Sequence, residues 1–218
     1  MTPGIASLRV ADPAEAWTRA GFGVDTNVEG GDGVCRIGGV GIRLVGRADG
    51  AGILGWALRG LPPGTRCDDV DGIPTTNAQD GAAAPGTHPN GVTAIDHVVL
   101  MSPDLDRTVA ALATLGVEPR RHRDAEIGGR PIRQIFFRFD DVVIEVVGSP
   151  DTAGTGPSTL WGITYVAADI DESARFFGDR TSAVKAAVQP GRRITTLRHR
   201  ELGLSVRTAL ISMSRARQ

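Results

Sequence analysis

The stretch AIDHVVLMSPDLDRTVAALATLG, residues 94–116, decides the fold. Its apolar run at 95–101 predicts a β-strand. The tripeptide Ser-Pro-Asp at 102–104 then supplies a helix start, because proline suits the first turn of a helix. Three apolar residues spaced i, i+4 and i+7 mark one face of a short helix: Leu105, Val109 and Leu112. Gly116 ends that helix.

Three strand-like runs follow this helix. They lie at about 117–122, 131–139 and 142–148, and the turn pairs Gly128-Gly129 and Asp140-Asp141 separate them. Residues 94–148 therefore predict a βαβββ unit.

The same order of elements recurs in LWGITYVAADIDESARFFGD, residues 160–179. Asp169 is a good helix N-cap. The helix face repeats the earlier spacing with Ile170, Ala174 and Phe177. Strands are expected near 184–188, 192–199 and 203–211.

A third copy is expected at the N-terminus, where the strand IASLRV leads into a helix. Asp12 is expected as the N-cap, Pro13 as the first helical residue and Glu15 at N3, an arrangement close to a capping box. Short strands near 23–28, 33–38 and 40–46 would complete it. Repetition at this period indicates one supersecondary unit used several times, although an ordinary α+β domain with accidental periodicity is the alternative.

The stretch between the first two copies is different. ILGWALR at 53–59 reads as a lone strand, and one hypothesis makes it the remnant of a fourth, decayed module. Residues 61–93 are rich in Pro, Gly, Asp and Thr, and we expect little regular structure there, as in a linker or lid. The expected divisions are 1–60, a degenerate module with an extra strand; 61–93, the linker or lid; and 94–150 and 157–213, two paired modules.

The segments IDHVVL, SPDLDRTV and VVIEVVG resemble the first strand, helix start and fourth strand of a vicinal-oxygen-chelate module, the family of glyoxalases, bleomycin-resistance proteins and ring-cleaving dioxygenases. The resemblance implies an α+β fold in which βαβββ modules pair into half-barrels with curved mixed sheets. It also implies that a metal, where one is present, takes a His or Gln and a Glu from the first and last strands of each module. It does not choose among reactions, because members include lyases, isomerases, dioxygenases and metal-free drug-binding proteins.

Two residues match those ligand positions. Strand alternation places His97 on one face of the first strand and Glu145 on one face of the last. They could be metal ligands, an acid/base pair or substrate contacts, or a structural hydrogen-bonded pair. A gapless comparison places Gly162 and Arg207 at the corresponding positions of the partner module, and neither side chain can ligate a cation. We therefore expect no tightly bound cofactor, with a weakly held divalent metal at His97 and Glu145 as the alternative.

The same alternation predicts the rest of a ligand cleft. Its expected substrate-binding residues are polar groups set among apolar ones, as in a small-molecule pocket: Gln134, Phe136, Thr164, Thr196, Arg198 and Arg207. The arginines either recognise an anionic group or lie on solvent-exposed strand faces. Glu145 could also pair with Arg207. The turn QPGRR at 189–193 favours an ordinary solvated turn over a substrate-binding edge.

Composition limits the partners. The 218 residues carry a formal net charge of −1, so nucleic acid is not expected to bind. No apolar run approaches the length of a membrane span, and no leader is evident, so we expect a cytoplasmic protein. The two cysteines lack metal-ligand spacing. A homodimer is an open alternative, because an unpaired half-barrel would expose sheet edges.

Three functions remain. The first is a glyoxalase-like enzyme, a lyase or isomerase or one of dioxygenase type, that acts on a small anionic or carbonyl-bearing metabolite, with His97 or Glu145 as base. The second is a metal-free binding or resistance protein that sequesters a small molecule. The third is a non-catalytic interaction scaffold.

Overall fold

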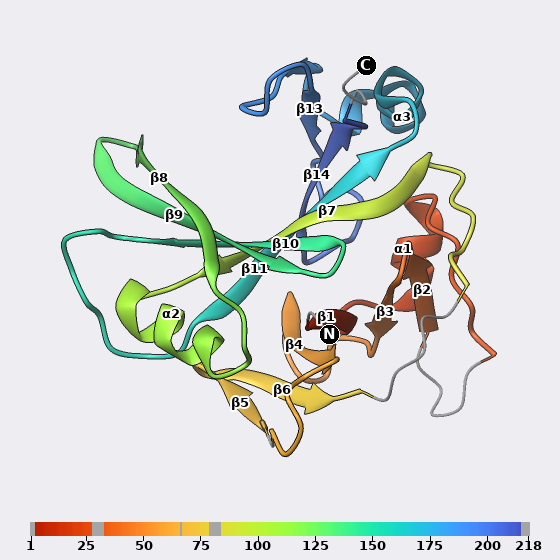
Figure 1. The fold of residues 1–218 in the computed structure, drawn as a ribbon. Helices are drawn as coiled ribbons and strands as arrows, with labels where there is room; N and C mark the ends of the chain where they lie inside the picture. The colour runs from red at the N-terminus through yellow and green to blue at the C-terminus, as the bar shows by residue number, and fades with distance from the viewer. Residues whose placement is uncertain (1–2, 28–32, 66, 79–83, 215–218) are drawn as a thin grey trace.

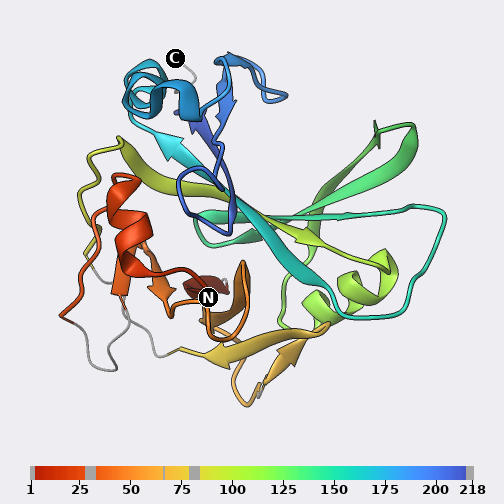
Figure 2. The ribbon, with the colours of Figure 1, turned by 180° about the vertical axis from the view of Figure 1, so that it is seen from behind.

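The computed structural model describes residues 3–27, 33–65, 67–78 and 84–214. They form two mixed β-sheets with short helices at their edges (Figure 1). The two sheets lie against each other, with strands β7 and β11 running through the middle of the molecule in the views from the front and from behind (Figures 1 and 2).

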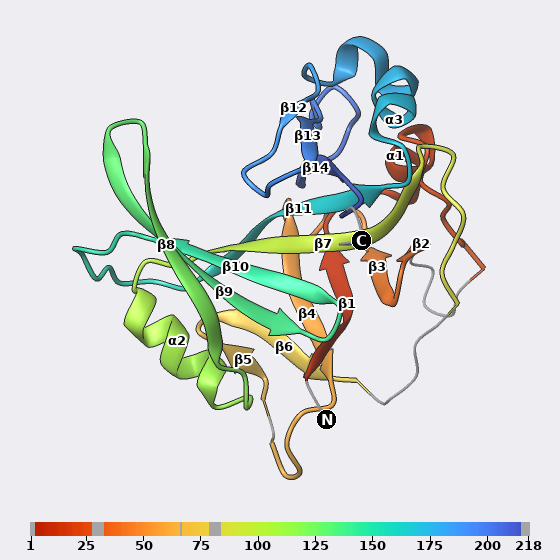
Figure 3. The same ribbon diagram turned by 45° about the horizontal axis from the view of Figure 1, so that its top comes forward.

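The larger sheet has eight strands in the order β12-β13-β14-β11-β7-β10-β9-β8. Its first module comprises β7 (Val92–Met101), α2 (Leu105–Ala113), β8 (Pro119–Ile127), β9 (Arg130–Phe139) and β10 (Val142–Gly148). Its second comprises β11 (Thr159–Ala167), α3 (Ile170–Phe177), a short 3₁₀ turn at Gly178–Arg180, β12 (Lys185–Ala186), β13 (Arg193–Thr196) and β14 (Arg207–Ser212). In each module the first strand pairs parallel with the fourth, and the two first strands pair antiparallel with each other. The sheet curls into a half-barrel (Figure 3), so the expected α+β fold of repeated βαβββ modules is confirmed.

The smaller sheet has six strands in the order β2-β3-β1-β4-β6-β5. Its strands and helix are β1 (Gly4–Val10), α1 (Ala14–Arg19), β2 (Gly33–Ile37), β3 (Val40–Leu44), β4 (Ile53–Arg59), β5 (Asp69–Val70) and β6 (Ile73–Asn77). Strand β4 pairs antiparallel with β1 and parallel with β6, and β6 pairs antiparallel with β5. The order β4-β6-β5 repeats the order β7-β10-β9 of the larger sheet, which is what a fourth module without its helix and its second strand would give.

The expectation of little regular structure over 61–93 is wrong where β5 and β6 lie. Apolar side chains explain the error: Val70 and Ile73 are buried, and Trp56 of β4 donates a 2.7 Å hydrogen bond from Nε1 to the Thr75 hydroxyl of β6. Partner strand β4 stabilises these short strands, and the periodicity of an isolated two-residue strand cannot reveal that.

The expected N-cap at Asp12 is also wrong. Helix α1 begins after Pro13 without a side-chain cap. The fully buried carboxylate of Asp12 instead accepts hydrogen bonds from Trp17 Nε1 at 3.1 Å and from the backbone N–H of Ser205 at 2.9 Å. Asp12 therefore ties the first module to the loop before β14. By contrast, Asp104 and Asp169 do cap α2 and α3, accepting from backbone N–H groups in the first turns.

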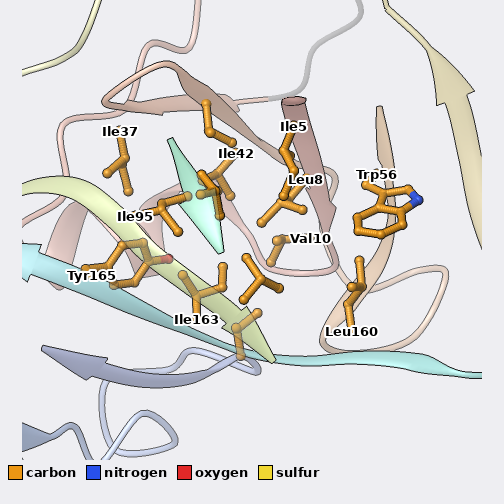
Figure 4. Close-up of a cluster of buried hydrophobic side chains, with 14 of the residues drawn as sticks. Ile5, Leu8, Val10, Ile37, Ile42, Trp56, Ile95, Leu160, Ile163 and Tyr165 are labelled. Atoms are coloured by element: carbon orange, nitrogen blue, oxygen red, sulfur yellow. The ribbon is translucent and has the colours of Figure 1, made fainter. Parts of the chain in front are cut away.

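The core lies between the two sheets (Figure 4). Ile5 and Leu8 of β1 point toward Ile95 of β7 and Ile163 of β11, and all four side chains are buried. This packing presses the smaller sheet against one face of β7 and β11. Residues at alternate positions, His97 among them, face the other side of the larger sheet.

Among the described residues, no helix combines the length and the apolar character needed to cross a membrane.

Candidate functional site

The site begins with an irregularity in β7. In its pairing with β11, His97 lies opposite Thr164, whereas the next residue of β11, Tyr165, lies opposite Ile95. Asp96 is therefore an extra residue in β7, a β-bulge, and a bulge re-aims the side chains beside it. As a result, the consecutive residues Asp96 and His97 both line one cavity.

Asp96 fixes the orientation of the His97 ring. One carboxylate oxygen, Oδ2, lies 2.8 Å from His97 Nδ1, and the other, Oδ1, accepts a 2.5 Å hydrogen bond from Arg192. Burial raises the pKa of the Asp96 carboxyl, but the hydrogen bonds from His97 and Arg192 outweigh burial and hold that pKa below its ordinary value. An ionised carboxylate only accepts hydrogen bonds, so His97 Nδ1 carries a hydrogen and Nε2 of the neutral ring carries the lone pair.

Glu145 lies on the other side of the imidazole. Its Oε2 is 3.5 Å from His97 Nε2, and its Oε1 accepts a hydrogen bond from the Gln134 amide. Arg123 donates to Gln134 Oε1 from Nε at 2.8 Å and from Nη2 at 2.5 Å. Arginine only donates, so this contact fixes which way the Gln134 amide points. The result is a continuous polar chain across the sheet: Arg192, Asp96, His97, Glu145, Gln134 and Arg123.

The cavity beside this chain has a volume of about 500 Å³. Strands β7, β9 and β10 form one wall, and the β2–β3 turn with Arg59 of β4 forms another. Its apolar lining consists of Ile5, Ile37, Val40, Ala94, Ile95, Phe136, Phe139, Val142, Val143 and Val166. The volume suits a small molecule, and the lining combines apolar side chains with many charged ones, which favours a polar or charged ligand.

Four arginines border the same cavity: Arg59, Arg121, Arg138 and Arg192. Arg192 comes from the turn before β13, and its side chain is only 12% exposed. It also donates from Nε to the Ser212 carbonyl at 2.7 Å, which anchors the turn to β14. The expectation that 189–193 forms an ordinary solvated turn is therefore wrong for Arg192, whereas Arg193 is exposed and pairs with Asp171.

The residues present do not fit the four-ligand metal site that the sequence resemblance implies. In the first module His97 pairs with Val143, and in the second module Gly162, the counterpart of His97, pairs with Arg207. Arg207 is therefore the counterpart of Val143. Glu145 lies two residues after Val143, so its counterpart is Ala209, two residues after Arg207. The gapless comparison that assigned Arg207 to this position is corrected by the sheet register. Neither glycine nor alanine can ligate an ion. Across the described segments, no group of three or more His, Cys, Asp or Glu side chains is placed to hold a metal.

The other predicted substrate-binding residues are dispersed. Phe136 lines the cavity, and Gln134 supports Glu145 without lining it. Thr164 is buried beside His97 in the sheet, outside the cavity lining. Thr196 and Arg198 are exposed, and Arg198 lies 3.6 Å from Glu201.

Arg207 does not approach this cavity, contrary to expectation. Its guanidinium lies over the exposed Trp161 ring, 4.6 Å from the centroid. Arg207 shares the face of the sheet that His97 occupies, but stacking on an aromatic ring holds its side chain away. Glu145 is therefore paired with Gln134 and His97, and the proposed pairing with Arg207 is not found.

Sequence reasoning missed Asp96, Arg192 and Arg121. One signal was present for Asp96, an acidic residue directly before His97 within an otherwise apolar strand. Strand alternation assigns two neighbours to opposite faces, and only the bulge reverses that assignment. No local pattern marks Arg121, and the QPGRR turn favours solvent for Arg192, because the positions of both residues depend on pairing between distant strands.

Several solved structures share the overall architecture. A mutant of 4-hydroxymandelate synthase from Streptomyces coelicolor matches all of this chain and 94% of its own with a TM-score of 0.68 at 15% identity. A catechol 2,3-dioxygenase matches 99% of this chain and 94% of its own with a TM-score of 0.61 at 13% identity. An extradiol ring-cleaving dioxygenase from B. fuscum matches 99% of this chain and 72% of its own with a TM-score of 0.59 at 14% identity.

This chain has the vicinal-oxygen-chelate fold. No family model matches its sequence, and no curated protein sequence matches it either. At these identities the likeness shows the fold alone, and the vicinal-oxygen-chelate fold supports several chemistries. The chemistry of the cavity beside His97 therefore distinguishes among these functions.

Proposed function

We propose that this protein binds a small anionic, carbonyl-bearing compound in the cavity beside His97 and transfers a proton at the carbon next to the carbonyl. The observation that carries the proposal is the Asp96–His97 pair in the cavity wall. With Nδ1 held by Asp96, Nε2 is the ring nitrogen left to accept a proton, and His97 lines a space large enough for a small metabolite.

His97 has the features of a general base. Asp96 holds the ring and stabilises the positive charge that the ring gains with a proton, the role that an acidic neighbour plays for catalytic histidines generally. Glu145 Oε2, 3.5 Å from Nε2, favours the same imidazolium. Transfer of a proton by His97 requires no metal ion. It therefore fits a site that has only His97 and Glu145 of the four residue positions that bind a metal in the family.

The bordering arginines favour an anionic ligand. When a proton leaves the carbon next to a carbonyl, negative charge moves to the carbonyl oxygen. The positive field of the four arginines at the cavity border offsets part of that charge.

Exchange of carbon-bound hydrogen with deuterium in D₂O tests the proposal, with a panel of oxo acids as probes and ¹H NMR as the readout. We expect exchange with the wild-type protein and a loss of about 10² to 10⁴-fold in His97→Gln, the usual contribution of a positioned base. The matched control is His122→Gln, since His122 is exposed on β8 and does not line this cavity.

Exchange that survives in His97→Gln would overturn the proposal. Binding that depends on His97 and Glu145 without any exchange would instead favour a metal-free binding protein, the second candidate, which the cavity itself supports. If neither binding nor exchange responds to these residues, the cavity is not the functional site, and an interaction scaffold becomes the better account.

A further inference from the structure

The charges around the cavity are mostly paired. Arg59 Nη2 lies 3.0 Å from Asp140, and Arg138 Nη2 lies 3.8 Å from Asp141. Arg192 is paired with Asp96. An anionic ligand would have to compete with these carboxylates for the three arginines. The three arginines therefore add to the positive electrostatic potential of the cavity but are not its anion-binding residue.

Arg121 is the exception. Its guanidinium lies over the Phe136 ring, 4.3 Å from the centroid, and Phe136 is buried. Within the described part of the chain, no carboxylate lies within ion-pair distance of Arg121. Stacking positions the planar group and leaves its N–H edges available, and these edges match a carboxylate.

Glu145 marks the other end of the site. Among the described residues, it pairs with no lysine or arginine, and its nearest basic group is His97 at 3.5 Å. An ionised Glu145 repels a second anion close to His97. The part of the ligand that lies at His97 is therefore neutral.

The sheet register sets the separation between these ends. Arg121 pairs with Phe136, and Phe136 pairs with Glu145, so the three residues form one row across β8, β9 and β10. Neighbouring strands lie 4.7–4.9 Å apart, so the Arg121 and Glu145 backbones are separated by about 9.6 Å. His97 lies on β7, one strand beyond β10, so the Arg121 and His97 backbones are about 14 Å apart, which favours a ligand whose carboxylate and carbonyl are several carbons apart.

We propose that the ligand is a monoanionic oxo acid whose carboxylate binds Arg121 and whose carbonyl group, several carbons away, lies at His97. This inference rests on the proposed function and narrows its substrate class. One uncompensated arginine matches one negative charge. The repulsion by Glu145 excludes 2-oxo acids, in which carboxylate and carbonyl are adjacent.

Calorimetric titration of the full chain with pyruvate, 4-oxopentanoate and 6-oxoheptanoate tests the inference. We expect affinity to rise along this series. Arg121→Gln should weaken binding of 6-oxoheptanoate at least tenfold, about 1.4 kcal/mol, and leave the weak binding of pyruvate unchanged. Arg121→Lys keeps the positive charge but loses the planar guanidinium that can bind both carboxylate oxygens. Its affinity for 6-oxoheptanoate should lie between those of the wild type and Arg121→Gln. The control is Arg130→Gln, because Arg130 is exposed at the start of β9 and does not line the cavity.

Three results would overturn the inference: equal affinity for the three acids, binding of 6-oxoheptanoate that is unchanged in Arg121→Gln, or no binding of 6-oxoheptanoate at millimolar concentrations. The neutral ketone 2-heptanone should bind weakly and with no response to Arg121. The deuterium-exchange assay is separate from this titration. Absence of exchange together with the expected binding series would remove the proposed catalysis and leave the ligand class intact.

Discussion

Replacing Asp96 by asparagine probes the base directly, because the substitution keeps the shape of the side chain and removes its charge. In the wild type, the two carboxylate oxygens accept separately from His97 Nδ1 and Arg192. Asparagine has one acceptor oxygen and one donor NH₂ group. Arg192 only donates, so it must take the oxygen, and the NH₂ group then faces His97 Nδ1.

That arrangement reverses the tautomer of His97. Nδ1 must accept from the amide, so the ring hydrogen moves to Nε2, where Glu145 Oε2 lies 3.5 Å away as an acceptor. Nε2 is then no longer a base, and we expect proton exchange to fall by about 10² to 10⁴-fold. Stability should fall as well. Arg192 is 12% exposed, and exchanging its charged partner for a neutral one should cost about 1–3 kcal/mol in the free energy of unfolding.

Long-range ¹H–¹⁵N NMR spectra of ¹⁵N-labelled protein at about pH 8, where ordinary histidines are neutral, distinguish the two tautomers. The chain has four histidines, and His97→Gln identifies the signals of His97. We expect the Nδ1–H form in the wild type and the Nε2–H form in Asp96→Asn. If His97 keeps the Nδ1–H form in Asp96→Asn, Asp96 does not set the tautomer, and the reasoning fails.

Three further predictions concern other parts of the fold. The Asp71 side chain is 3% exposed and accepts hydrogen bonds from Arg107, Thr108 and Ser158. Asparagine tolerates the left-handed backbone of Asp71, so Asp71→Asn should lower the free energy of unfolding, measured in urea, by about 1.5–3 kcal/mol through the lost charge alone. A change below about 0.5 kcal/mol would contradict this role. His88 is buried, and its Nδ1 accepts a hydrogen bond from the backbone N–H of Gly23. Burial lowers the pKa of His88 below its ordinary value of 6.5. Just below pH 6.5 the folded state therefore binds fewer protons than the unfolded state. The melting temperature should therefore fall as pH drops through that value, and this decline should flatten in His88→Gln. Burial raises the pKa of the Cys35 thiol to about 12, so a thiol reagent should modify only Cys67 in the folded protein, and rapid labelling of Cys67→Ser would contradict the buried position of Cys35.

Much of the fold could be predicted because its signals are local. The apolar run at 95–101 and the Asp104 cap define β7 and the start of α2, and both lie where the periodicity places them. The β5–β6 pair was missed because its stability comes from β4 and buried apolar contacts, which no short window contains. Asp12 was misassigned for the same reason, since its partner at Ser205 is 193 residues away.

The site was predictable only in part. Strand alternation brought His97 and Glu145 to one face, and they do approach each other. Strand alternation does not predict the β-bulge that brings Asp96 to the same face as His97. It also does not predict the pairing register that makes Ala209 the counterpart of Glu145. It also gives the direction of Arg207 but not its stacking on Trp161. Side chains that are long, or that depend on pairing between distant strands, need the folded structure.

The most direct test of the central claim is a crystal structure of the protein with bound 6-oxoheptanoate. The account predicts that the carboxylate lies within hydrogen-bonding distance of Arg121 and that the carbon next to the carbonyl faces His97 Nε2. A ligand bound with its carboxylate at His97, or bound beside Arg207 and Trp161 outside the cavity, would contradict it.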